Sequence, residues 1–314
     1  MRSPRLLLIF AVGLAALALL TLRHRPQPVA PIVTLPAQAP EPAPTPEPVP
    51  LHPSVLDLLQ KGGSGDLQGA LVAAEKLSPQ LSPSDSAALL QWTTGPRPEK
   101  LYDDAWFGLV NDVWNALRRQ RAPAPELAPA LIAFFRDPAT PYVLRDYSIQ
   151  HLGSYLEDDF AKLDTTQRNA ILNTFLQAAS MRSQGFAGTA LYSLQSLRPQ
   201  LSKDSPAFAE NLAQAALALL ADPAANKLAR ISAFQIAIEN ADPRALIHAR
   251  RIAADPSGEP MLRAPAIAYL GRLGTSEDAN LLKSIHDGCS DRRLLGALNP
   301  ALAKLAASTA SPVR

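Results

Sequence analysis

The stretch DDAWFGLVNDVWNALRR, residues 103–119, decides the fold class. Its large apolar side chains recur at intervals of three and four residues, which places them on one face of an α-helix. These side chains are Trp106, Val110, Val113, Trp114 and Leu117. Two aspartates stand at the start of the stretch and two arginines at its end, an arrangement that suits the helix dipole. The pattern predicts an amphipathic helix that buries one face.

Similar segments follow one another through residues 51–314. Asp164 followed by Gln167, and Thr275 followed by Asp278, have the spacing of capping boxes at helix starts. Apolar residues make up 47% of the sequence and aromatic ones only 6%, so the core must consist mainly of Leu and Ala, which favour helices. Runs of residues typical of strands are scarce. We therefore expect an all-α fold of about a dozen or more helices, stacked as helical hairpins.

An apolar segment precedes this region. Residues 6–22, LLLIFAVGLAALALLTL, carry no charge and follow Arg2 and Arg5. The segment is close to the minimum length of about 17 residues for a helix that spans a bilayer. A cleavable signal peptide would end at a site with small residues, whereas Arg23 follows this segment at once. We expect an uncleaved signal anchor, a transmembrane helix within residues 1–25, with a cleaved signal peptide as the alternative.

A proline-rich stretch follows the apolar segment. Ten of the 30 prolines lie between residues 26 and 50. Because proline fixes φ and favours extended neighbours, we expect a disordered linker, about 75 Å long if fully extended. A ligand for a proline-recognition domain is the alternative. A short amino-terminal tail in the cytoplasm is the commoner arrangement for such an anchor. We therefore expect a single-pass protein of the bacterial inner membrane, with residues 51–314 in the periplasm.

The charge balance argues against nucleic acid as a partner. The chain holds 30 basic and 28 acidic residues, and its first 50 residues, with four arginines and two glutamates, account for the whole excess. Residues 51–314 therefore have no net charge. Nucleic-acid binding requires a basic surface that neutralises phosphates. The sequence predicts no nucleic-acid partner.

A weak internal repeat occurs within residues 122–307. An Asp-Pro pair is followed eight residues later by Arg, and three residues after that by a small residue. The pattern occurs three times, with Asp137 and Arg145, Asp222 and Arg230, and Asp255 and Arg263. Asp242-Pro243 also matches, but too close to the next start for a whole repeat to fit. The spacing indicates repeated helix pairs.

This pattern resembles HEAT-like repeats, including the short kind in proteins related to bilin lyases. The resemblance implies an α-solenoid, a right-handed stack of antiparallel helix pairs with a long surface suited to binding partners. It also implies structural roles for the repeated residues. The aspartates would accept backbone hydrogen bonds in turns, and the arginines would bond to neighbouring turns from the starts of second helices.

We find no catalytic, cofactor-binding or metal-binding motif. None of the five histidines belongs to an HExxH pattern. His286 and Cys289 lie three residues apart, but a structural zinc site requires four ligands. The acidic run at residues 157–159 has groups that ligate calcium or transfer protons, although a turn or a helix start is the preferred interpretation. The sequence predicts no catalytic residue, no cofactor and no metal.

Two functional hypotheses follow. The preferred one is a membrane-tethered scaffold that binds a protein partner of the cell envelope without catalysis. The alternative is an enzyme, or an accessory subunit of one, with a lyase-like site in the groove of the solenoid. A pocket that gathers distant carboxylates with His151 or His248 would favour the alternative.

Overall fold

The computed structural model describes residues 50–204 and 207–310 of the chain, which belong to one folded unit, Val49–Arg314. The predicted anchor and most of the predicted linker lie outside the described residues. The described part holds fifteen α-helices, one short 3-10 helix and no strand, so the predicted all-α class is confirmed. The helices are α2 Pro53–Ser64, α3 Leu67–Glu75, α4 Pro83–Thr94, α5 Asp103–Arg118, α6 Leu127–Arg136, α7 Tyr142–Asp159, α8 Thr165–Ser180, α9 Phe186–Ser196, α10 Arg198–Asp204, α11 Phe208–Ala221, α12 Lys227–Glu239, η1 Pro243–Ala245, α13 Leu246–Ala254, α14 Pro260–Leu273, α15 Ser276–Asp287 and α16 Arg292–Ala310.

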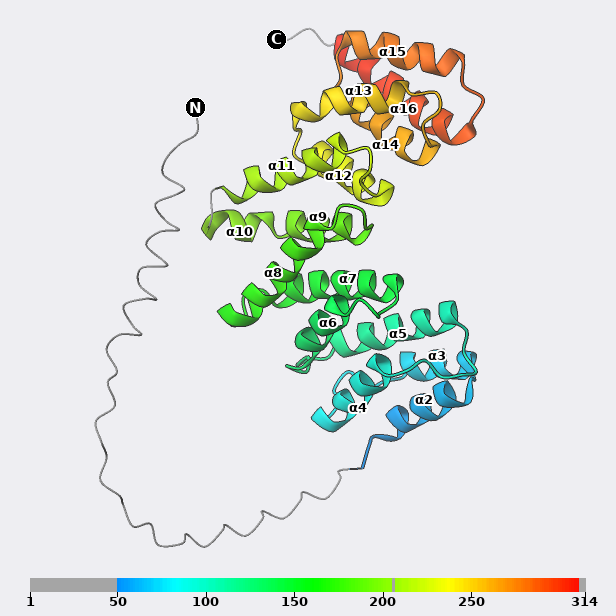
Figure 1. Ribbon diagram of the computed structural model, residues 1–314, viewed down its shortest axis with the longest axis vertical. Helices are drawn as coiled ribbons and strands as arrows, with labels where there is room; N and C mark the ends of the chain where they lie inside the picture. Colours follow the sequence, from blue (N-terminus) through cyan, green and yellow to red (C-terminus); the bar gives the residue numbers. More distant parts are fainter. Residues whose placement is uncertain (1–49, 205–206, 311–314) are drawn as a thin grey trace, which may run out of the picture. The chain divides into compact units, whose positions relative to one another are not determined.

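Consecutive helices pack as pairs that follow one another along the unit (Figure 1). The pairs α6 with α7, α8 with α9, α11 with α12 and α13 with α14 each make extensive contact. The second helix of each pair also packs on the second helix of the next, in the order α5, α7, α9, α12, α14, α16. Each pair thus buries an apolar face against its neighbours, which gives a solenoid-like arrangement. None of the helices in the described part is long and apolar enough to cross a membrane.

The helix starts use the chemistry that the sequence predicts. Asp164 precedes α8 and accepts a hydrogen bond from the backbone N of Gln167 at 2.8 Å. At α15, the backbone N of Thr275 donates to the carboxylate of Asp278 at 2.7 Å. These contacts satisfy backbone donors that have no partner inside the helix. Both predicted caps are therefore confirmed.

The predicted apolar face of α5 is buried in the core. All five side chains of the face are less than one-tenth exposed. The indole Nε1 of Trp114 donates to the hydroxyl of Thr93 on α4 at 3.0 Å, and the ring of Trp106 meets Trp92 edge-on at 4.9 Å. The aromatic rings of α5 thus hold α4 in place through both apolar and polar contacts.

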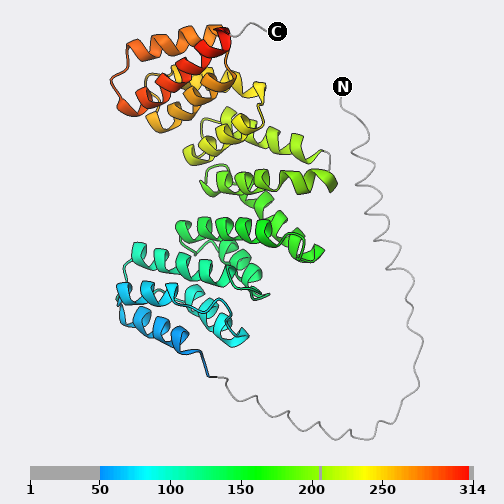
Figure 2. The ribbon, with the colours of Figure 1, turned by 180° about the vertical axis from the view of Figure 1, so that it is seen from behind.

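The first helices of successive pairs form a layer that lacks close contact at two places, between α8 and α11 and between α11 and α13, where η1 packs on α11 instead. α4 packs on α6, and α6 packs on α8, but α8 does not pack closely against α11. The short helix α10 lies between α8 and α11 in both views (Figures 1 and 2). It packs on α9 and α11 instead. The interruption between α8 and α11 leaves part of their facing sides uncovered.

Candidate functional site

The aspartates of the repeat pattern lie in turns between paired helices. The carboxylates of Asp137, Asp222 and Asp255 each accept a hydrogen bond from the backbone N two residues later, at 2.8, 2.9 and 3.0 Å. Asp242, the extra match, accepts from the backbone N of Arg244 at 3.1 Å in the same way. Such side-chain contacts stabilise a turn. The turn geometry is therefore common to all four Asp-Pro pairs.

The arginines of the pattern lie in the first half of the second helix of each pair. Arg145 donates from Nε to the carbonyl ten residues earlier at 2.8 Å, and Arg263 does so at 3.2 Å. Arg230 reaches the equivalent carbonyl only through Nη2, at 3.5 Å. These carbonyls lie at the carboxyl-terminal ends of first helices, where a cation is favourable. The arginines thus connect the two helices of a pair.

The histidine and cysteine side chains singled out above do not come together. His151 is buried, and its Nε2 lies 3.1 Å from the side-chain oxygen of Asn111. His286 Nε2 lies 3.1 Å from the side-chain oxygen of Asn299. The thiol of Cys289 points to a backbone oxygen two residues later, at 3.6 Å. No described pocket gathers a histidine with distant carboxylates.

The acidic run at residues 157–159 ends helix α7. Asp158 forms an ion pair with Arg118, and Asp159 forms one with Lys162 at 2.6 Å. Within the part of the chain that the structure describes, no group of three or more His, Cys, Asp or Glu side chains is placed to hold a metal ion. The run thus ends a helix, pairs with the next turn through Lys162 and connects α7 to α5 through Arg118.

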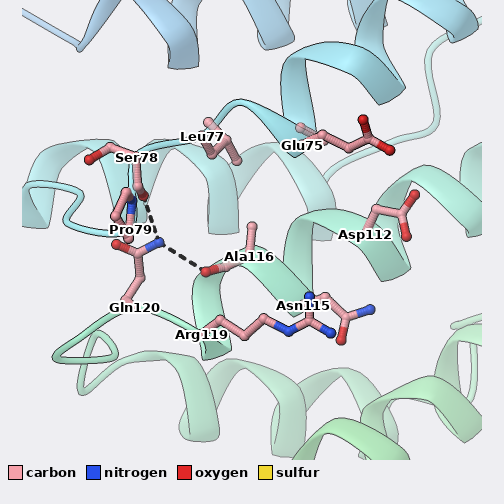
Figure 3. Close-up of a pocket in the computed structure, with 10 residues that line it drawn as sticks. Glu75, Leu77, Ser78, Pro79, Asp112, Asn115, Ala116, Arg119 and Gln120 are labelled. Carbon is pink, nitrogen blue, oxygen red and sulfur yellow. Dashed lines mark hydrogen bonds between the residues drawn. The ribbon is translucent and has the colours of Figure 1, made fainter.

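A polar pocket of about 400 Å³ lies between α3 and α5 (Figure 3). Gln120 forms one wall, because its amide donates to the carbonyls of Ser78 at 3.0 Å and Ala116 at 2.9 Å. The carboxylates of Glu75 and Asp112 lie away from Gln120, on the other side of the pocket. Desolvation, and then the charge of Glu75, raise the pKa of Asp112. Both acidic residues are exposed, so solvent already satisfies them and the pocket is a weak candidate site.

An apolar pocket of about 620 Å³ lies where α8 and α11 separate. From α8, Leu172, Leu176 and Ala179 line it, at the spacing of one helix face. From α11, Leu212 and Ala215 line it at a similar spacing. Further apolar residues come from α9, α10 and the start of α11, namely Leu191, Leu194, Leu201 and Phe208. The side chain of Leu176 is 57% exposed although it lies on this apolar surface. A cavity of this size and composition is typical of small-molecule sites.

The rim of this apolar pocket carries hydrogen-bonding groups but no acid. Its polar residues are Asn169, Asn173, Ser180, Arg182 and Asn211. Asn169 and Ser180 are eleven residues apart on α8, which corresponds to about 16 Å along a helix. The polar groups therefore lie at different points along an elongated apolar surface. An elongated apolar molecule with a polar end fits such an arrangement.

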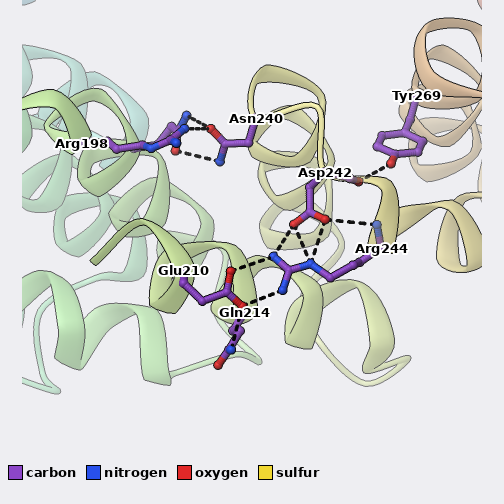
Figure 4. A network of polar contacts seen from close by, with 8 residues as sticks. Arg198, Glu210, Gln214, Asn240, Asp242, Arg244 and Tyr269 are labelled. Carbon is purple, nitrogen blue, oxygen red and sulfur yellow. Dashed lines mark hydrogen bonds and ion pairs between the residues drawn. The ribbon is translucent and has the colours of Figure 1, made fainter. Parts of the chain in front are cut away.

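A polar network holds α11, one wall of the apolar pocket, against the turn that follows α12 (Figure 4). Arg244 pairs with Glu210 of α11 at 2.6 Å and with Asp242 at 2.8 Å. The hydroxyl of Tyr269 donates to the backbone carbonyl of Asp242. Desolvation raises the pKa of Tyr269 to about 12, and the charge of Asp242 adds to this effect. The hydroxyl therefore remains a donor, and the network fixes the position of α11.

Sequence reasoning did not identify the apolar pocket. Its leucines have the same spacing as leucines that pack in the core, so the pattern alone does not distinguish them. One signal of the pocket was present in the sequence. The short segment RPQLSKD, residues 198–204, lies between two longer apolar segments and carries an apolar residue, Leu201. That short helix replaces a direct contact between α8 and α11.

Comparisons with known proteins find little similarity. No protein-family model matches the chain, and no curated protein matches it. Among solved structures, the chain is similar to human deoxyhypusine hydroxylase in complex with glycerol. The identity is 15%, the TM-score is 0.36, and the match covers 81% of this chain and 96% of that chain.

The expected function, a scaffold without catalysis that binds a protein partner, is corrected here. The similar solved chain carries the name of an enzyme. At this TM-score the likeness transfers no reaction and no residue. The physical reason for the correction is the apolar pocket, whose volume suits a small molecule.

Proposed function

We propose that the folded unit is an accessory subunit of an enzyme. It binds a small amphipathic molecule with one alkyl chain in the apolar pocket between α8 and α11. The observation that carries this proposal is the apolar cavity at the interruption between α8 and α11. By contrast, α4 packs directly on α6, and α6 packs directly on α8. Leaving apolar surface in water is unfavourable, at about 25 cal/mol per Å². A bound apolar chain removes that cost.

The pocket lining supports binding rather than chemistry. It holds leucine, alanine and phenylalanine, three asparagines, one serine and one arginine. It holds no His, Cys, Asp, Glu, Lys or Tyr among its described residues, so it lacks a general base. The asparagine amides and Arg182 supply donors for a carboxylate or another polar end group. For these reasons we assign the site a role in holding a ligand for another subunit.

We infer that the architecture is a HEAT-like helical repeat. The repeated turns support this inference, because each pairs an aspartate that accepts a backbone hydrogen bond with an arginine that bonds to the end of the preceding helix. Repeats of this kind leave surfaces between neighbouring units that take ligands. The pocket lies between the α8–α9 pair, whose turn lacks this pattern, and the α11–α12 pair, which carries it.

Photoaffinity labelling of the full-length chain tests the proposal. The probe is a long-chain alkyl carboxylate that carries a diazirine on its chain, and the labelled residues are mapped by mass spectrometry. We expect labels on α8 between residues 169 and 180 and on α11 between residues 208 and 215. An excess of unlabelled alkyl carboxylate should remove these labels.

Two matched variants separate the pocket from non-specific binding. Ala215→Phe places a ring in the pocket and should abolish labelling of α8 and α11, because Ala215 lines the pocket and is only partly exposed. Ala133→Phe makes the same change on an exposed face of α6 and should leave the labels unchanged. Equal labelling of both variants, or labels spread evenly along the chain, would refute the proposal. Binding only of an amphipathic peptide would also refute it.

A further inference from the structure

A third cavity, of about 670 Å³, lies where α12, α13 and α14 meet, away from the apolar pocket. Four basic and two acidic side chains line it. The basic residues are Lys227, Arg230, Arg251 and Arg263, and the acidic ones are Asp255 and Glu259. The lining therefore carries an excess of positive charge.

The two acidic residues already have partners. Asp255 accepts hydrogen bonds from the hydroxyl of Ser257 at 2.7 Å and from its backbone N at 3.0 Å. Glu259 pairs with Lys227 at 2.7 Å. Within residues 50–204 and 207–310, the three arginines of the cavity form no ion pair. By contrast, Arg244 and Arg250 nearby are both paired with carboxylates. The excess positive charge of the cavity thus rests on arginines that form no direct ion pair, although the charges of Asp222 and Asp255 act on Arg230 and Arg263 from further away.

Arg230 is the most buried of these arginines, with 8% of its surface exposed. In Arg145 and Arg263, the equivalent Nε donates to a carbonyl at the end of the preceding helix. The Nε of Arg230 is buried and has no partner in the described part of the chain. Within the described residues its guanidinium makes one hydrogen bond, from Nη2 to the carbonyl of Leu220 at 3.5 Å, and Arg251 donates to the same oxygen at 3.2 Å. Two guanidinium groups thus share one acceptor, and each has further N–H groups that could donate a hydrogen bond.

Burial of an unpaired charge is unfavourable, unless hydrogen bonds and an opposite charge compensate for it. Desolvation, and then the charge of Arg251, lower the pKa of Arg230, and the charge of Asp222 offsets only part of this shift. The pKa of His248 on α13 is also lowered, by desolvation and then by Arg251 and Arg230. These shifts are consistent with a positive electrostatic potential in the cavity. An anion in the cavity would supply the missing opposite charge, and acceptors for the guanidinium nitrogens that face the cavity.

We propose that this cavity binds the phosphate group of a small molecule through Arg230, Arg251 and Arg263. The planar guanidinium fork matches the oxygens of a phosphate group and makes two parallel hydrogen bonds to it. Arg230 comes from α12, Arg251 from α13 and Arg263 from α14, so the anion joins three consecutive helices. The cavity is larger than a phosphate ion, which leaves room for an organic group attached to it.

The test is calorimetric titration of the full-length protein with inorganic phosphate and with glycerol 3-phosphate, at constant ionic strength in chloride. We expect saturable binding by the natural chain. Arg251→Gln should weaken it at least tenfold, because it removes one guanidinium while leaving the core intact, Arg251 being exposed. Arg293→Gln makes the same charge change at an exposed position on α16 and should bind as the natural chain does.

Thermal unfolding supplies a second measurement. Phosphate should raise the Tm of the natural chain and leave that of Arg230→Met unchanged, since methionine keeps the apolar stem without the charge. Binding only to vesicles that contain phosphatidic acid, and only when Arg251 is present, would support the phosphate site and assign it to a lipid. Equal affinity of the natural chain and Arg251→Gln for phosphate would overturn the proposal. So would the absence of any binding of phosphate, glycerol 3-phosphate or these vesicles beyond that of chloride.

Discussion

Acidification is predicted to destabilise the fold through His151, a buried side chain on α7. The ring is 4% exposed, it contacts Asn111, and it meets Trp114 edge-on at 5.7 Å. Burial lowers its pKa from 6.5 to about 4, and the charges of Arg118 and Arg119 add to this shift. Because the folded pKa lies below the unfolded one, the unfolded chain binds a proton first as the pH falls. Stability is therefore fully present above pH 6.5 and is lost as the pH falls toward 4.

The magnitude follows from the two pKa values. One pKa unit corresponds to about 1.4 kcal/mol. With an unfolded pKa of 6.5 and a folded pKa of about 4, the loss in the free energy of unfolding is about 2 kcal/mol at pH 5 and about 3 kcal/mol at pH 4. This is a large fraction of the stability of a typical domain.

The assay is urea unfolding of the natural chain and of His151→Gln at pH 7.5, 6, 5 and 4, followed by tryptophan fluorescence. Glutamine keeps a side-chain donor for Asn111 but does not titrate. The carboxylates are the same in both proteins, so the difference between the two curves isolates His151. The natural chain should lose about 3 kcal/mol more than the variant between pH 7.5 and pH 4. Parallel curves would refute the reasoning.

Two further predictions test the packing of the helices. Gly271→Ala should destabilise the fold by about 1–3 kcal/mol in urea unfolding, because a Cβ there would lie 2.5 Å from a backbone atom of α16. Gly108→Ala is the control: its Cβ would meet open space, so it should stabilise the fold by up to about 1 kcal/mol. Equal effects of the two changes on stability would contradict the close packing of α14 on α16. Thr93→Val should cost about 1–3 kcal/mol, because it leaves the indole N–H of Trp114 buried without an acceptor. Thr94→Val, on an exposed position of the same helix, is the control and should change stability by less than about 0.5 kcal/mol.

The helices of the described part were predictable because local signals mark them. The spacing in α5 and the caps at Asp164 and Thr275 depend only on neighbours within a few residues, and the chain uses them as the sequence predicts. The Asp-Pro pattern likewise reflects local turn chemistry, which explains why the extra match at Asp242 also forms a turn. Element type is therefore encoded locally in this chain.

The candidate sites were not predictable in the same way. Leu172 and Leu212 have the pattern of core residues, and they line a cavity only because α10 replaces the contact between α8 and α11. From the sequence, the pair Arg250-Arg251 resembles the solvated basic end of a helix. In the structure, Arg251 and Arg230 both donate to the carbonyl of Leu220. Both features depend on how distant helices pack, and a single sequence does not reveal that. The expected protein-binding function was wrong for the same reason, since the anchor, the linker, the repeat and the missing catalytic motif on which it rested do not show how distant helices pack.

The central claim is that the pocket between α8 and α11 holds a small amphipathic molecule. Native mass spectrometry of the purified full-length chain, with Ala215→Phe and Ala133→Phe as the two variants, tests it most directly. We predict one bound small molecule on the natural chain and on Ala133→Phe, either copurified or added as an alkyl carboxylate, and none on Ala215→Phe. The same bound mass on all three proteins, or no bound molecule on any of them after addition of the alkyl carboxylate, would contradict the claim.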